Sequence, residues 1–119
     1  MTLPVKPPRV VADVHITSDA PLTDVAALVG KALWLTFVRE LTGRYAELPA
    51  FVSQGIGLHF ALVGPPSGST REPGCALEVD PLSRRFSGPR IDISEFLAAV
   101  ITERAGLLTS ARRRAGRRR

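Results

Sequence analysis

The amino-acid sequence predicts an α+β fold, in which a small, mostly antiparallel sheet of three or four strands carries two helices on one face. Three observations predict it. Two short stretches alternate apolar and polar residues, a third is apolar on both of its faces, and two longer stretches repeat apolar residues every three or four positions. The expected element order is β-α-β-β-(β)-α. Residues 1–8 are expected to form an extended lead-in, residues 9–108 one domain, and residues 109–119 a disordered, arginine-rich tail.

The strands are predicted from period-two patterns. Residues 57–64 are mostly apolar on both faces of such a ribbon, which is typical of a strand inside a sheet. Residues 10–17 alternate, with a polar face of Asp13, His15 and Thr17. Residues 75–80 alternate again and are expected to pair with 57–64 as an antiparallel hairpin. Residues 84–87 would add a short basic edge strand, and residues 43–52 are expected to be a loop.

Two helices are predicted from apolar spacing. The first is expected over residues 22–41, with Pro21 in its first turn and Gly43 as its stop. Its apolar stripe is wider than one face, which indicates deep burial or an oligomer contact. The second begins at Asp92 or Ser94, where Asp92 and Glu95 have the spacing of a capping box.

Composition restricts the function classes. The chain has 119 residues, 45% of them hydrophobic, enough for a core. Its single cysteine, Cys75, cannot form an internal disulfide, and no signal peptide opens the chain, so a cytoplasmic location is expected. The most apolar stretch, residues 25–38, is too short to span a bilayer, and no membrane association is expected.

The positive charge is concentrated in the tail. Six of the 16 basic residues lie there, which leaves 10 against 11 acidic residues in the rest of the chain. These six are Arg112, Arg113, Arg114, Arg117, Arg118 and Arg119. They could neutralise nucleic-acid phosphates, or they could serve as a solubilising end.

The histidines are the only hint of site chemistry. If the predicted strands are adjacent, one sheet face gathers polar side chains that could bind a metal, act in acid–base chemistry or meet a partner. This set is Asp13, His15, Thr17, His59, Glu78 and Asp80. The histidines lack a close ligand spacing, Cys75 has no surrounding motif, and the loop at 64–70 lacks the lysine of a phosphate-binding loop. No catalytic residue, metal or cofactor is therefore expected.

Three segments resemble small cytoplasmic immunity proteins of bacterial toxin systems. They are residues 44–52 (RYAELPAFV), 57–66 (GLHFALVGPP) and 92–97 (DISEFL), and the resemblance from the first to the last of them spans about half the chain. The resemblance implies a non-enzymatic protein that binds and neutralises a cognate toxin, with Tyr45, Glu47 and the polar sheet face as contacts. The basic tail departs from the acidic surface of a nuclease-blocking member.

The resulting hypothesis is a protein-binding module that covers its partner's working surface. The expected partner-binding residues are Tyr45, Glu47, Asp13, His15, Thr17, His59 and Glu78. The alternative hypothesis is a nucleic-acid-associated protein that uses the arginine tail. A third hypothesis is a subunit that forms an oligomer through the first helix.

Overall fold

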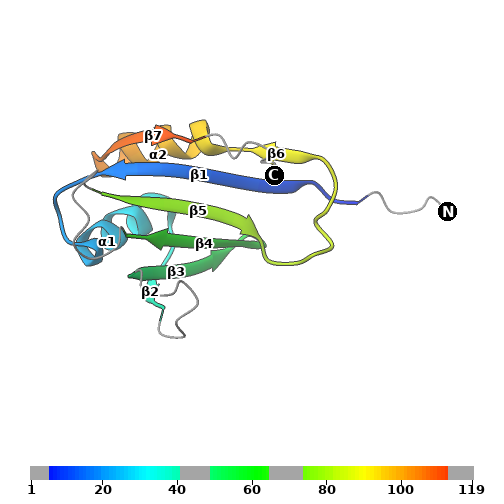
Figure 1. Ribbon diagram of the computed structural model, residues 1–119, viewed down its shortest axis with the longest axis horizontal. Helices are drawn as coiled ribbons and strands as arrows, with labels where there is room; N and C mark the ends of the chain where they lie inside the picture. The colour runs from blue at the N-terminus through cyan, green and yellow to red at the C-terminus, as the bar shows by residue number, and fades with distance from the viewer. Residues whose placement is uncertain (1–5, 41–48, 65–73, 113–119) are drawn as a thin grey trace.

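The computed structural model describes residues 6–40, 49–64 and 74–112, which form seven strands and two helices (Figure 1). In chain order the elements are β1 (Arg9–Thr17), α1 (Leu22–Leu33), β2 (Val38–Arg39), β3 (Ala50–Gly55), β4 (Leu58–Val63), β5 (Cys75–Pro81), β6 (Arg90–Asp92), α2 (Ser94–Ala105) and β7 (Leu108–Ala111). The α+β class is confirmed. The sheet has seven strands rather than three or four, and the element order differs from the expected one.

The sheet runs in the order β2-β3-β4-β5-β1-β6, with β7 also paired to β1. Neighbours are antiparallel except β1 and β6, which are parallel. β4 lies between β3 and β5, and the antiparallel pairing of β4 with β5 confirms the expected hairpin. β3 occupies part of the segment that the sequence assigned to a loop, so that assignment was wrong from Ala50 onward.

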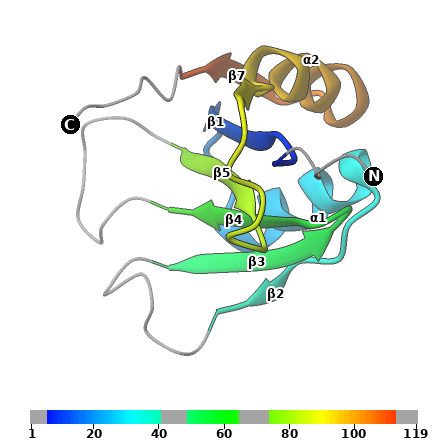
Figure 2. The ribbon, with the colours of Figure 1, turned by 90° about the vertical axis from the view of Figure 1, so that its right-hand side faces the viewer.

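The core lies between the sheet and both helices. Ala12, Val14 and Ile16 of β1 are fully buried, as are Leu77 and Val79 of β5. The helices contribute to the same cluster, α1 with Val25, Ala26 and Val29, and α2 with Leu97, Ala98 and Ile101. In Figure 1 both helices therefore lie behind the strands, and Figure 2 shows them on the same side of the sheet. The opposite side is referred to below as the open face.

The first helix is shorter than the apolar spacing predicted. It ends at Leu33, and Trp34 adopts the left-handed conformation, with φ 57° and ψ 42°. The Leu35 amide then donates to the Gly30 carbonyl over 2.8 Å. A Cβ on Gly30 would come within 2.5 Å of the Leu35 carbonyl oxygen, so this fold-back requires glycine. Leu35 and Val38 therefore leave the helix, and the wide helical stripe proposed for oligomerisation is not formed.

Both β6 and β7 pair with the same edge of β1. β6 lies beside Arg9, Val10 and Val11, while β7 pairs with the stretch from Val14 to Thr17. The predicted edge strand at 84–87 is wrong, because these residues lie in the turns that precede β6. Residues 109–111, assigned to the tail, belong to β7. Neither helix in the described part of the chain is long and apolar enough to cross a membrane.

Candidate functional site

The open face is built from alternate residues of five strands, arranged in cross-strand rows. The central row joins Asp13 of β1, Glu78 of β5, Ala61 of β4, Val52 of β3 and Val38 of β2. It is acidic at one end and apolar at the other. The face thus carries a charge gradient across the sheet, perpendicular to its strands.

The two flanking rows continue this division. One joins Ser110, His15, Ala76, Val63 and Ala50. The other joins Asp80, His59 and Gln54. Thr17 lies beside Leu108 at the far end of β1. The register therefore brings all five predicted strand residues, Asp13, His15, Thr17, His59 and Glu78, onto the open face together with Asp80.

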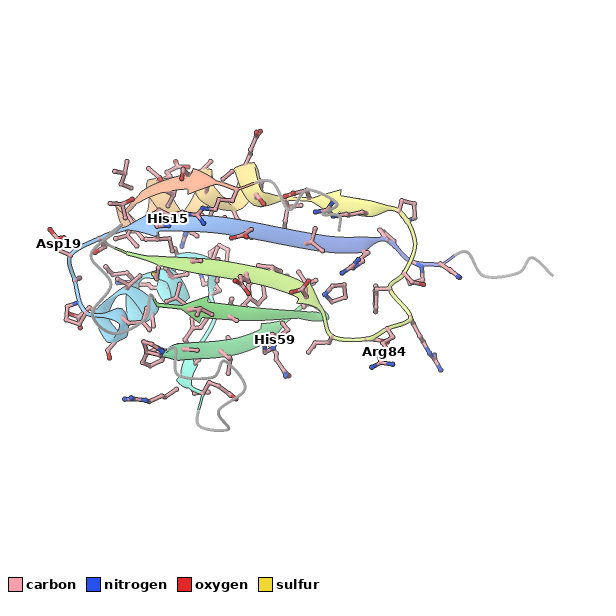
Figure 3. The ribbon with its side chains drawn as sticks, in the orientation of Figure 1. His15, Asp19, His59 and Arg84 are labelled. Atoms are coloured by element: carbon pink, nitrogen blue, oxygen red, sulfur yellow. The ribbon has the colours of Figure 1, made fainter. Side chains whose placement is uncertain are left out.

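The two histidines are too far apart to share a ligand. His15 lies opposite Ala76, and His59 lies opposite Asp80. Ala76 and Asp80 are four residues apart on β5. At about 3.3 Å per residue and about 4.8 Å per strand, their backbones are separated by roughly 16 Å. Figure 3 shows them on opposite halves of the sheet. No group of three or more histidine, cysteine or acidic side chains among the described residues could hold a metal ion.

A buried serine fixes the acidic end of the face. Ser94, at the start of α2, is 2% exposed. Its hydroxyl accepts a hydrogen bond from the Asp13 amide over 2.8 Å and donates to the Asp92 carboxylate. Asp92 also accepts from the Ser94 amide over 2.8 Å, so it satisfies one of the unpaired amides of the first turn. Asp92 thus helps begin α2, while Ile93 occupies the cap position.

Arg112 lies over the same end. Its amide donates to the Asp13 carbonyl over 2.7 Å, and its guanidinium Nη2 is 3.4 Å from His15 Nδ1. Because arginine has no acceptor, this contact requires Nδ1 of His15 to be unprotonated. Arg112 is the one member of the predicted arginine set that lies in the described part of the chain. Residues 113–119, Tyr45 and Glu47 lie outside the described residues.

The apolar end of the face carries a second small cluster, formed by Ala50, Ala61 and Val63 with Val52 packed against it. Beside it, Val38 is 57% exposed and Trp34 is 81% exposed. These two residues line a shallow groove along β3 with Val52 and Gln54. The Arg104 side chain of α2 holds this region in place, since its guanidinium stacks 4.4 Å from the Trp34 ring centre and donates to the Ala32 carbonyl.

Sequence reasoning missed this groove because it placed Trp34 and Val38 on a helix. It also missed a second depression, where Arg9, Arg84 and Arg90 meet at the end of the sheet that faces the reader in Figure 2. The only available signal was a scatter of arginines far apart in the chain.

Cys75 is buried, and burial raises the pKa of its thiol from 9.0 to about 12. The thiol is therefore protonated at neutral pH, and the thiolate is the reactive form of cysteine.

Comparison with protein-family models finds no match, and neither the curated proteins nor the solved structures contain a match to this chain.

Proposed function

We propose that the protein is a non-enzymatic module that binds another protein through its open face. The observation that carries this proposal is the composition of the central cross-strand row. Asp13 and Glu78 lie directly opposite each other at one end, and Val52 and exposed Val38 lie at the other. Both described helices pack on the reverse side of the sheet, so they do not cover this row.

The chemistry of the row specifies the partner. A basic side chain of the partner would be attracted to this acidic end, because opposite charges across an interface set its orientation and increase the association rate. An apolar or aromatic side chain would bury Val38 and Val52, and desolvated aromatic and apolar contacts supply most of the energy of protein interfaces. The expected partner is therefore a protein surface with adjacent basic and apolar groups.

The mechanism is occlusion, in which a preformed sheet face covers the working surface of the partner. The resemblance to immunity proteins makes a toxin domain the first partner to look for. A sheet needs little rearrangement to bind, so most of its contact energy appears as affinity. No described residue is required to perform chemistry in this proposal.

The test is capture from an extract of the source cell with the full-length protein as bait, followed by titration of the purified partner. The face variant combines Val38→Lys with Glu78→Lys, which replaces an apolar contact and reverses the acidic end. Leu28→Lys is the matched control, because Leu28 is 40% exposed on α1, on the other side of the sheet.

We expect the face variant to weaken binding at least about 30-fold, since one central interface residue contributes about 2 kcal/mol or more. The control should bind as the natural chain does. Equal binding by both variants would exclude the open face. Turnover of a substrate by the pure protein, abolished by replacing His15 or His59 without unfolding, would overturn the non-enzymatic proposal.

A further inference from the structure

Positive charge gathers at one end of the sheet, away from Asp13 and Glu78 of the central row. There Arg9, Arg84 and Arg90 line an open depression together with Phe86 and Ser87. Asp80 is the single carboxylate among the described residues that line it. Arg84, labelled in Figure 3, lies on the loop that joins β5 to β6.

The fold, and not the order of the sequence, brings these arginines together. Arg9 begins β1 and Arg90 begins β6, and the parallel register places the two residues side by side. Two positively charged side chains at adjacent register positions repel each other, and the one carboxylate among the described residues of the depression, that of Asp80, balances only one of its three positive charges. An anionic ligand bound here would therefore interact with both guanidinium groups at once.

The loop that carries Arg84 is fixed to the sheet by main-chain hydrogen bonds. The Leu82 amide donates to the Gly57 carbonyl over 2.9 Å, and the Gly88 amide donates to the Pro7 carbonyl over 2.8 Å. A Cβ on Gly88 would come within 2.4 Å of the Lys6 carbonyl oxygen, so the two backbones are in close contact at this point. The depression is consequently a formed part of the fold, and binding there does not have to order its wall.

Phe86 distinguishes between possible anions. Its side chain is 37% exposed and belongs to none of the apolar clusters of the described residues. Guanidinium groups bind phosphates and carboxylates through paired hydrogen bonds, so the arginines alone do not choose between nucleic acid and acidic peptide. An exposed aromatic ring beside them offers a base a stacking surface, which a peptide carboxylate does not use.

We propose that this depression binds single-stranded nucleic acid, with Arg9, Arg84 and Arg90 contacting backbone phosphates and Phe86 stacking on one base. The proposed contacts come from β1, β6 and the loop between β5 and β6, and none of them belongs to the arginine set at 112–119 or to the central row of the open face. Three phosphate contacts and one stacked base constitute a small site, so binding is weak and strongly dependent on salt.

The experiment uses the full-length protein and a fluorescein-labelled oligothymidylate, with anisotropy followed at several salt concentrations. The phosphate variant is Arg84→Gln with Arg90→Gln, and the stacking variant is Phe86→Leu, which keeps an apolar side chain. Lys31→Gln with Arg39→Gln, which removes two exposed positive charges on α1 and β2, is the matched control. Thermal unfolding verifies that each variant is folded. Every variant keeps residues 112–119, so a contribution from the tail is common to all of them.

We expect the phosphate variant to lower the log–log salt slope by about 1.4, since each single-strand phosphate contact contributes about 0.7. Phe86→Leu should weaken binding at least about fivefold while leaving the slope unchanged, because stacking contributes about 1 to 3 kcal/mol per base. Identical isotherms for all variants would overturn the proposal. The proposal would also be overturned if polyglutamate bound as tightly as the oligonucleotide and if Phe86→Leu did not change its binding. That outcome would assign the depression to acidic peptides.

Discussion

Raising the pH above 9 is expected to destabilise the protein because of one buried thiol. Cys75 begins β5 opposite Ile16 and is 5% exposed, and burial raises the pKa of its thiol from 9.0 to about 12. In the unfolded chain the thiol loses its proton near its ordinary pKa. Because the folded pKa is the higher one, the stability from this group is complete below pH 9 and is lost as the pH rises toward 12.

The size of the loss follows from the difference between the two pKa values. The free energy of unfolding falls by about 1.4 kcal/mol for each pH unit above 9, so the loss is about 2 kcal/mol at pH 10.5. Native Cys75 should also react with a thiol reagent roughly 1,000-fold more slowly than the unfolded chain at pH 8, because the thiolate is the reactive form.

Urea titrations of the natural chain and of Cys75→Ala, at pH values from 8 to 10.5, measure this effect. Lysine and tyrosine titrate in both proteins, and the cavity left by the substitution is a constant offset, so the difference between the two curves isolates the thiol. We expect that difference to change by about 2 kcal/mol across the range. A difference that does not vary with pH, or native labelling as fast as unfolded labelling, would refute the argument.

Four further substitutions test the fold. Gly74→Ala should destabilise the protein by about 3 kcal/mol or more in urea unfolding, because its φ is +118° and a Cβ would lie 2.0 Å from the Ile16 carbonyl oxygen. Gly57→Ala is the comparison, because a Cβ there would have no atom within 4 Å, and it should cost about 1 kcal/mol. Ile56→Asn should stabilise by about 1 kcal/mol, because Ile56 is 96% exposed at φ 53° and Asn-Gly suits this hairpin turn. Ser94→Ala should cost about 2 kcal/mol, since the Asp13 amide loses its acceptor. No change in Gly74→Ala or in Ser94→Ala would contradict the backbone positions described.

Local periodicity predicted the parts of the fold that depend on it. Alternation in β1 and β5 identified the face each side chain takes, and antiparallel pairing through β4 then brought His59 and Glu78 onto the face of Asp13. Because a strand's side chains alternate strictly, the face is determined once adjacent strands are paired in register. The open-face residues could therefore be named before the strand order was known.

The errors arose where a distant contact overrides local pattern. Residues 34–38 have helical apolar spacing, but Gly30 lets the chain pass back over the helix, so Trp34 and Val38 reach the edge of the sheet instead. β6 and β7 contain three and four residues, too few for a period to be visible. Both are strands because β1, with nine residues, offers an edge long enough for each to pair with a different part of it.

Charge is the clearest case of information that the fold adds to the sequence. Apart from six tail arginines the chain is nearly neutral, with 10 basic and 11 acidic residues, and counting alone gives no reason to expect a charged surface. The fold nevertheless places Asp13 and Glu78 on the open face and pairs Arg9 with Arg90 at the end of the sheet. Surfaces of opposite sign attract different partners, so the two proposed sites should respond independently. Glu78 lies opposite Asp13, four residues along β1 from Arg9, so the two backbones are roughly 14 Å apart. Glu78→Lys should therefore leave the oligonucleotide salt slope unchanged, because charges more than about 10 Å apart are screened at 0.1 M salt.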